Sequence, residues 1–177
     1  QLKSQIGVGF VQGEGVSQIT QRIRKTINTQ SRHAQSIART ALNGISSDIR
    51  EGIYKENSDI VKGVKIVASL DMRTSDICIS LDGKVYPVGE GGRPPFHINC
   101  RSTTVPITKS WRELGIDKDD LSPGTRRDMN GSVPANTTYP EWLKGQTQKT
   151  QEEVLGVGKA QLFRNGDLDL NKFVNRI

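Results

Sequence analysis

Two cysteines and one histidine are the residues of this sequence best suited to bind a metal ion or to act as a nucleophile. They are Cys78, His97 and Cys100, and the chain has no further cysteine. His97 and Cys100 have the His-x-x-Cys spacing of metal ligands, and zinc prefers imidazole and thiolate ligands. Because zinc usually takes four ligands, Asp71 or Asp76 would have to add an oxygen. A structural zinc ion is therefore the one candidate cofactor.

Other chemistries remain open for the same three side chains. Cys78 and Cys100 could form a disulfide, although such bonds are rare in a reducing cytoplasm. They could equally be free thiols beside a hydrogen-bonding His97, since free cysteine is among the most buried residue types. A Cys/His nucleophile pair is the conceivable enzymatic use. Against it, the sequence carries no P-loop, no G-x-S-x-G motif and no HNH-type run.

Cys78 needs a turn to bring it toward the other two residues. Asp82 and Gly83 lie between two short runs of apolar and polar residues, 77–81 and 84–88. A glycine after aspartate lets the backbone adopt positive φ, which is typical of a tight hairpin turn. The pattern therefore predicts a β-hairpin that folds Cys78 back toward the loop that follows.

A loop over residues 89–95 precedes His97 and Cys100. Its three glycines allow many backbone conformations, and Pro94 and Pro95 stiffen its end. We therefore expect the loop to deliver His97 and Cys100 to a fixed place.

Three charged residues close to these candidates predict a structural anchor. Asp71 and Arg73 precede Cys78, and Arg101 follows Cys100. An ion-pair network among Asp71, Arg73 and Arg101 would tie the loop to the strand before it. Paired charges of this kind are structural as often as functional.

Strand-like runs flank the turn and the loop. Residues 64–70 are rich in valine, isoleucine and other small apolar residues, and residues 103–108 are rich in threonine. Such β-branched residues are typical of strands. Together with the predicted hairpin, they indicate a small antiparallel β meander over about residues 64–108.

The residues before the meander show helical periodicity. Residues 1–15 are glycine-rich and predict irregular structure, whereas residues 16–56 predict two helices. The second helix has small and branched apolar residues at intervals of three and four, which predict a buried stripe. The stripe consists of Ala34, Ile37, Ala38, Ala41, Ile45, Ile49 and Ile53.

After the meander, residues 109–177 predict loops and short helices. Gly166 is expected to end one of these helices as a left-handed cap. The whole chain, residues 1–177, is expected to form a single α+β domain that is mostly helical. Four short helices are expected in this part. One starts at Pro140, and the other three cover residues 148–155, 157–163 and 168–174.

Composition argues against a membrane-spanning protein and points to an anionic partner. The sequence has no run of eighteen apolar residues. Residues 1–70 hold ten Lys/Arg against five Asp/Glu, and the remaining residues hold fifteen against fourteen. This N-terminal excess favours non-specific contact with double-stranded DNA, and a solvated surface without a partner is the alternative. The residues expected to contact DNA are Arg22, Lys25 and Arg32.

The motifs of this chain resemble those of one protein family. The patterns D-x-R-T-x-x-x-C-x-x-L-D-G-x-V and P-P-x-H-x-N-C-R-S, within residues 71–102, are similar to the signature of phage Mu protein F-like minor head proteins. Shorter similarities extend the resemblance to about residues 15–177. They comprise Ile37, Ala38, Arg39, Thr40 and Leu42 upstream, and Trp142, Leu143, Gln146, Leu155, Leu162, Phe163, Gly166, Leu168 and Leu170 downstream.

The resemblance implies a virion structural protein and no enzymatic activity. Its relatives act in head assembly and in the retention and ejection of packaged DNA. The implied partners are the portal protein, the major capsid protein or both, together with double-stranded DNA, and an oligomeric arrangement in the particle is left open. The implied location is the phage head, assembled in the bacterial host cytoplasm. The alternative is a small metal- or thiol-dependent enzyme delivered with the phage genome. Because the sequence begins at Gln1 and not at methionine, we expect further chain upstream.

Overall fold

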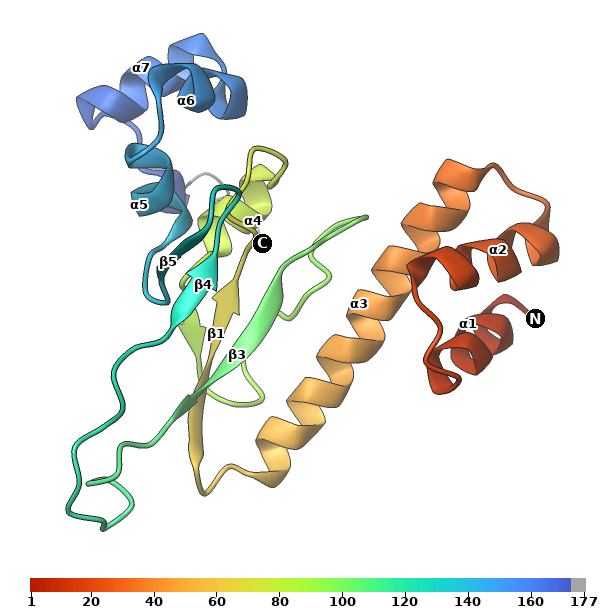
Figure 1. The fold of residues 1–177 in the computed structure, drawn as a ribbon, viewed down its shortest axis with the longest axis horizontal. Helices are drawn as coiled ribbons and strands as arrows, with labels where there is room; N and C mark the ends of the chain where they lie inside the picture. Colours follow the sequence, from red (N-terminus) through yellow and green to blue (C-terminus); the bar gives the residue numbers. More distant parts are fainter. Residues whose placement is uncertain (173–177) are drawn as a thin grey trace.

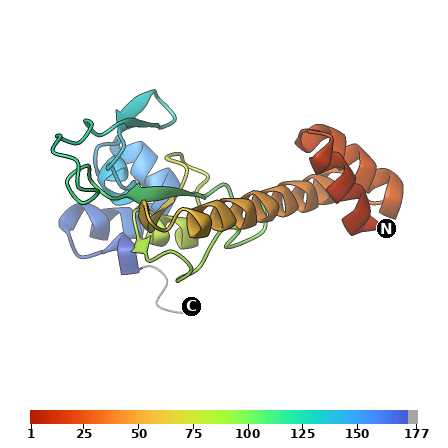
Figure 2. The same ribbon diagram turned by 90° about the horizontal axis from the view of Figure 1, so that it is seen from below.

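The computed structural model describes residues 1–172 and confirms the expected α+β class. Figure 1 shows a group of short N-terminal helices, one long helix, a small sheet and a second group of helices toward the C-terminus. Seen from below in Figure 2, the long helix links the N-terminal helices to the rest of the molecule. Within residues 1–172, no helix is long and apolar enough to cross a membrane.

Helix α1 (Leu2–Val11) corrects the prediction that residues 1–15 are irregular. It packs on α2 (Val16–Ile27), and Gly9 makes the close contact possible. A Cβ atom added to Gly9 would lie only 2.8 Å from Ile19 Cγ1. The glycines that suggested a loop therefore serve helix packing, and tertiary contacts stabilise a helix whose intrinsic propensity is weak. The core of this region consists of Ile6, Ile19, Ile23, Ala34 and Ala38.

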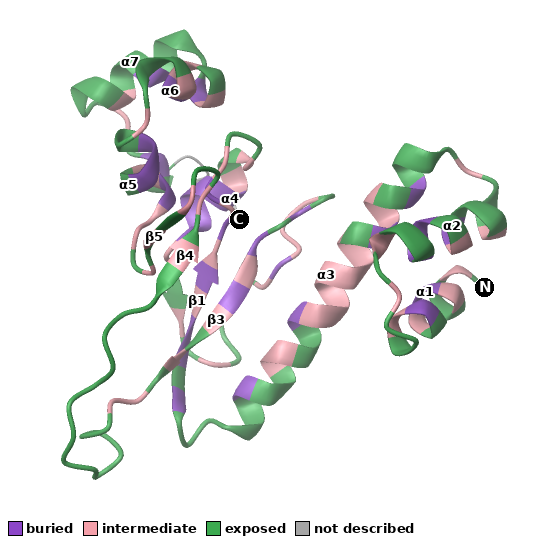
Figure 3. Cartoon of the chain, viewed as in Figure 1, coloured by how far each residue is buried: buried purple, intermediate pink, exposed green. Residues whose placement is uncertain are grey.

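Helix α3 (Ser31–Glu56) has 26 residues and spans about 39 Å at 1.5 Å per residue. Its N-terminal half packs against α1 and α2, and its C-terminal half reaches the sheet through Tyr54, whose hydroxyl donates to Thr104 O at 3.2 Å. The predicted buried stripe holds only in part, because Ile49 and Ile53 are 48% and 54% exposed. The sheet contacts a different face of the helix from the one on which this stripe lies. Ile49 and Ile53 are therefore exposed to solvent. Figure 3 shows this mixture of half-buried and exposed residues along α3.

The sheet has three antiparallel strands in the order β2-β1-β3. They are β1 (Val61–Val67), β2 (Val85–Tyr86) and β3 (Thr103–Thr108). Lys65 of β1 faces Val85 on one side and Val105 on the other. The predicted strand 103–108 and the antiparallel arrangement are thus confirmed.

The predicted hairpin at Asp82 and Gly83 is wrong, because residues 76–81 form helix α4 (Asp76–Leu81). Ser75 caps this helix, and its hydroxyl accepts a hydrogen bond from Cys78 N at 3.4 Å. A β-branched sequence is helical here because the cap and full burial of the turn outweigh local strand propensity. The expected positive φ at Gly83 is observed, at 81°, but it connects α4 to β2.

The C-terminal part contains a two-stranded hairpin and three short helices. Helices α6 (Gln148–Leu155) and α7 (Val157–Asn165) and the φ of 85° at Gly166 agree with the sequence prediction, whereas the hairpin was not predicted. The expected helix over 168–174 is a 3₁₀ turn, η1 (Leu170–Lys172), and residues 173–174 lie outside the described part. The other elements are β4 (Thr125–Arg127), β5 (Ser132–Pro134) and α5 (Tyr139–Lys144).

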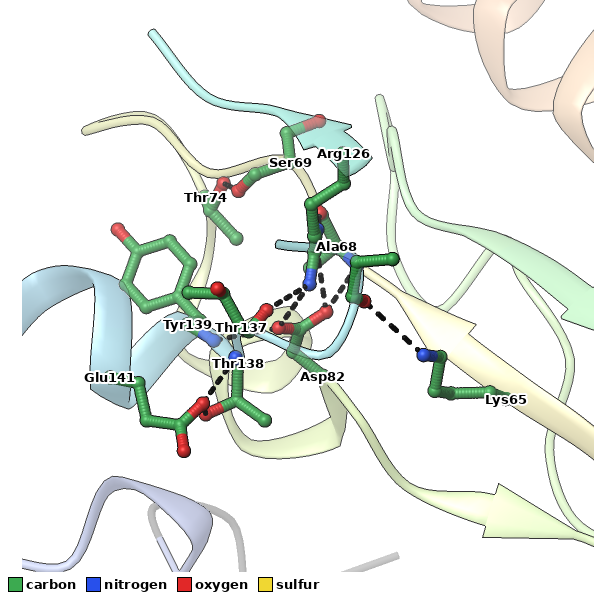
Figure 4. A network of polar contacts seen from close by, with 11 residues as sticks. Lys65, Ala68, Ser69, Thr74, Asp82, Arg126, Thr137, Thr138, Tyr139 and Glu141 are labelled. Carbon is green, nitrogen blue, oxygen red and sulfur yellow. Dashed lines mark hydrogen bonds and ion pairs between the residues drawn. The ribbon is translucent and has the colours of Figure 1, made fainter. Parts of the chain in front are cut away.

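A buried carboxylate joins this C-terminal part to the sheet and to α4. Asp82 Oδ1 accepts from Ala68 N at 2.6 Å, and its Oδ2 accepts from Tyr139 N at 2.7 Å. Arg126 Nη1 donates to Oδ2 at 3.0 Å, and Arg126 Nη2 donates to Oδ1 at 3.1 Å (Figure 4). Arg126 also donates to the carbonyl oxygens of Ala68 and Thr137. Four segments of the chain therefore meet at one ion pair.

Candidate metal centre

The structure brings Cys78, His97 and Cys100 together. Cys78 Sγ lies 3.7 Å from Cys100 Sγ and 3.1 Å from His97 Nε2. The three ligand atoms all lie within 4.8 Å of one another. Both cysteines are buried, and His97 is half-buried. Two sulfurs and one imidazole nitrogen at this spacing form a donor set that suits zinc.

Cys78 reaches the cluster from the first turn of α4. The cap by Ser75 fixes the start of this helix, and Thr74 holds the preceding turn by donating from Oγ1 to Ser69 O at 2.6 Å. Helix geometry then sets the direction of the Cys78 side chain. The predicted convergence is therefore achieved by a capped helix and not by a hairpin.

Side chains of α3 hold the loop that carries His97 and Cys100. Asn99 N donates to Thr40 Oγ1 at 3.0 Å, and Asn43 Nδ2 donates to Cys100 O at 2.8 Å. Asn99 has a φ of 61°, a left-handed conformation that asparagine tolerates better than most residues, and its Nδ2 donates to Ser36 Oγ at 3.0 Å.

Sequence reasoning missed the three residues of α3 that hold this loop. Ser36, Thr40 and Asn43 lie at helical spacing, so they form a polar stripe beside the apolar one. This polar stripe was the feature of the sequence that could have predicted the contact between the loop and α3. Polar residues next to a predicted buried face would have indicated that a loop lies across the helix.

The glycine-rich part of the same loop is fixed further along α3. Glu51 Oε2 accepts from Arg93 Nε at 2.7 Å, and Glu51 Oε1 accepts from Gly89 N at 2.8 Å. Both charged side chains are 15% exposed. This half-buried ion pair supplies the order that the glycines alone could not provide.

The hydrogen bond of the His97 ring determines which nitrogen is free. Nδ1 lies 2.7 Å from Ile98 O, and because a carbonyl oxygen can only accept, Nδ1 carries the proton. In the neutral ring, Nε2 therefore presents a lone pair toward Cys78 Sγ and toward Ser75 Oγ, which is 2.9 Å away. Metal-binding histidines commonly donate their other ring N–H to a backbone carbonyl in this way.

The two thiols influence each other's ionisation. Both are free, and their sulfurs are much farther apart than the roughly 2.05 Å of a disulfide. The hydrogen bond from Cys78 lowers the pKa of Cys100, since a thiolate is the better acceptor. The same hydrogen bond and burial raise the pKa of Cys78. Of the two, Cys100 is therefore the one whose thiolate is favoured, and a thiolate is the form that binds metal.

A small polar cavity of about 20 Å³ adjoins the cluster. That volume is close to what one water molecule requires. Ser102 lines the cavity and is 2% exposed, and its Oγ lies near Cys78, where it favours the thiolate, but has no close hydrogen-bond partner among the described residues. The remaining lining residues are Ser69, Arg73, Thr74, Ser75, Cys78, His97, Asn99 and Arg101.

The predicted anchor residues lie beside this cavity. Arg101 binds Asp71 with both Nη atoms, one of them 2.7 Å from Oδ1. Arg73 donates its backbone N–H to Asp71 Oδ1 at 2.9 Å, and its side chain lies 3.8 Å from Oδ2 and is 82% exposed. The hydrogen bond from Arg101 lowers the pKa of Asp71 to about 2. Asp71 and Asp76 both lie outside the metal-ligand group, so neither supplies the expected oxygen.

The residues expected to contact DNA differ in their surroundings. Arg22 forms an ion pair with Glu14, with Nη2 and Oε1 2.5 Å apart, and it also donates to Gln5 and Gln12. Its charge therefore ties α2 to α1 and to the turn after it. Lys25 and Arg32 are exposed.

Comparison with known proteins gives one match. The sequence model of a protein family described as phage Mu protein F like protein matches residues 1–105, which include α1 to α4, strands β1 and β2, the start of β3 and all three candidate ligands. The search of curated proteins finds no match, and no solved structure matches either.

Proposed function

The chain belongs to the phage Mu protein F like family, a family of phage head morphogenesis proteins, and we propose that it is a minor head protein. In this proposal the protein lies at the portal vertex or on the inner capsid surface. It binds the portal protein, the major capsid protein or both. Its role is head assembly and the retention and ejection of packaged DNA. The observation that carries the proposal is the family match, which covers more than half of the chain.

The shape of the molecule supports a bridging role. Helix α3 separates the α1 and α2 helices from the sheet and the C-terminal helices, as Figures 1 and 2 show. Two ends held apart by one helix can engage two different partners. We assign the DNA to the N-terminal helices, since the basic excess lies in that half of the chain.

The proposed location is tested on particles from a lysate of induced host cells. Mass spectrometry of gradient-purified heads is expected to detect the chain at low copy number, and deletion is expected to give particles of poor infectivity. A matched strain with the deletion complemented in trans is the control. Absence of the chain from heads at every assembly stage would overturn the proposal.

The proposed DNA contact is tested through its salt dependence. For each phosphate that the protein ceases to neutralise, the slope of log K against log salt should fall by about 0.9. Replacing both exposed residues, Lys25→Gln and Arg32→Gln, is therefore expected to reduce the slope by about 1.8. The control replaces two exposed residues far from α2, Lys144→Gln and Lys149→Gln, and should leave the slope unchanged. Equal slopes for both double variants would show that Lys25 of α2 and Arg32 of α3 do not contact DNA.

The second candidate function is that of a thiol- or metal-dependent enzyme delivered with the genome. The observation in its favour is the 3.1 Å contact between Cys78 Sγ and His97 Nε2 beside a cavity. A screen against ester, peptide and phosphodiester substrates separates it from the structural role. Activity that disappears in Cys78→Ser would favour the enzyme, and particles that remain infectious with this substitution would favour the structural role.

A further inference from the structure

We propose that Cys78, His97 and Cys100 bind one zinc ion, and that its fourth ligand is a water molecule or small anion in the cavity beside Ser102. This inference goes beyond the proposed head function and does not rest on it.

The spacing of the three ligand atoms suits a single tetrahedral ion. With zinc–sulfur and zinc–nitrogen bonds of about 2.3 and 2.0–2.1 Å, two sulfurs lie about 3.8 Å apart, and a sulfur and a nitrogen lie about 3.5 Å apart. The observed separations are 3.7 Å between the two sulfurs and 3.1 Å between Cys78 Sγ and His97 Nε2. Small rotations of the side chains therefore suffice to admit the ion.

The surroundings prepare these atoms for a cation. The proton on His97 Nδ1 is directed to Ile98 O, which leaves Nε2 as the ligand atom. The backbone of Cys100 is held by Asn43 of α3, and that of Cys78 by the cap of α4. The ligands are therefore positioned by α3, by α4 and by the loop that carries His97 and Cys100.

The fourth position has no protein ligand among the described residues. The carboxylate of Asp71 is bound by Arg101, and Asp76 lies 3.9 Å from Lys159 on the surface of α4. The cavity adjoins Cys78 and His97, and its volume is close to that of one water molecule.

Ser102, beside Cys78, gives a further indication of a ligand. A buried hydroxyl without a partner is costly, and native structures rarely leave one unexplained. Its Oγ is buried and the residue lines this cavity, so a bound water or anion would satisfy it. Arg73 and Arg101 also line the cavity, and their positive charges favour an anionic ligand.

Metal content tests the first part of the proposal. Protein purified in the presence of zinc is expected to contain about one zinc per chain, and the same protein reconstituted with Co²⁺ should show thiolate-to-cobalt charge-transfer absorption. His97→Asn should lose the metal, whereas His33→Asn, which alters the chain's other histidine on α3, should keep it. The wild-type measurement needs no variant to fold. Wild-type protein that binds neither ion would overturn the site.

Azide binding to the Co²⁺ protein tests the fourth position. Azide is expected to change the visible spectrum by displacing water, and Ser102→Ala should raise the half-saturating azide concentration about tenfold, the effect of losing one hydrogen bond. Ser47→Ala is the matched control, since Ser47 Oγ is also buried without a partner but does not line the cavity. A Co²⁺ spectrum that azide leaves unchanged would show a closed site and overturn the exchangeable ligand while leaving the metal in place. An equal response of both serine variants would overturn the role of Ser102.

Discussion

Asp82 and the Cys78–His97–Cys100 cluster lie at opposite ends of helix α4, and both are buried polar centres. Each Asp82 oxygen accepts two hydrogen bonds, and the side chain has no exposed surface. The cluster instead has three converging ligand atoms, an adjoining cavity and an unpartnered hydroxyl on Ser102. One centre is complete within the protein, and the other has room for a further atom.

This difference separates a structural role from a ligand-binding role. A buried charge is tolerated when every lone pair has a donor, and such a network fixes the segments that supply the donors. A buried donor or acceptor without a partner costs free energy unless something else satisfies it. The Asp82 centre therefore joins four segments of the chain, whereas the Cys78 centre is the one that can bind a ligand.

The largest expected effect comes from breaking the Asp82 centre. Asp82→Ala leaves the guanidinium of Arg126, which is 11% exposed, without its counter-charge. Removing one partner of a buried ion pair costs about 3–5 kcal/mol. The free energy of unfolding from urea denaturation should fall by that amount.

The control for this experiment is an ion pair in solvent. Arg112 and Asp119 are 3.0 Å apart, and their side chains are 71% and 94% exposed. Asp119→Ala should leave the urea midpoint unchanged within error, since exposed pairs contribute little. Similar losses in both variants would mean that burial does not distinguish the two pairs.

The next effect concerns the metal. A ligand that binds only the folded protein stabilises it by about 2.7 kcal/mol when its free concentration is 100 times Kd. Zinc at that concentration should raise the urea midpoint of the wild-type protein, and a chelator should reverse the change. Cys100→Ser should show no difference between the two conditions. If the urea denaturation curves of the wild-type protein are identical with zinc and with chelator, the Cys78 centre does not bind zinc. The proposed difference between the two centres would then be wrong.

A smaller effect is expected from the anchor between Asp71 and Arg101. The pKa of Asp71 is lowered from 3.8 to about 2 in the folded protein, chiefly by the hydrogen bond from Arg101. The unfolded chain therefore binds the proton first as the pH falls. The stabilisation is fully present above about pH 4 and is lost as the pH falls toward 2. Because both side chains keep some exposure, we expect on the order of 1–2 kcal/mol.

Acid denaturation of the metal-free protein measures this contribution. The wild-type protein should lose more stability than Asp71→Asn between pH 4 and pH 2. Metal-free protein is used because protonation of the cysteine ligands would otherwise add its own pH dependence. Parallel curves for the two proteins would show that the ion pair does not stabilise the fold.

Local patterns were sufficient for some elements of this fold. The strand at 103–108, the helix at 148–155 and the cap at Gly166 follow from β-branched content, helical spacing and a well-placed glycine, and all three agree with the structure. Helix α1 packs against α2 and helix α4 against the C-terminal part of the chain, and these tertiary contacts outweigh local propensity, which predicted both segments wrongly. The single-domain organisation stays a prediction.

The candidate site was predictable in its residues but not in its construction. The types and spacing of Cys78, His97 and Cys100 indicated convergence, but the side chains of α3 that hold the loop were missed. The role of Asp82 could not be predicted from the sequence, because an aspartate before a glycine is typical of a turn. Its partners Arg126 and Tyr139 lie 44 and 57 residues away. Long-range hydrogen bonds of this kind leave no local periodicity.

The smallest expected effect comes from Ser47, a buried residue of α3 that is 3% exposed and whose Oγ has no partner among the described residues. Alanine removes the unsatisfied hydroxyl and has the higher helix propensity. Ser47→Ala should therefore raise the free energy of unfolding by about 0.5–1 kcal/mol. Thermal and urea denaturation at neutral pH measure the change. If Ser47→Ala instead destabilises the protein by more than about 1 kcal/mol, its hydroxyl binds something too, and an unpartnered hydroxyl would no longer single out the cavity beside Ser102.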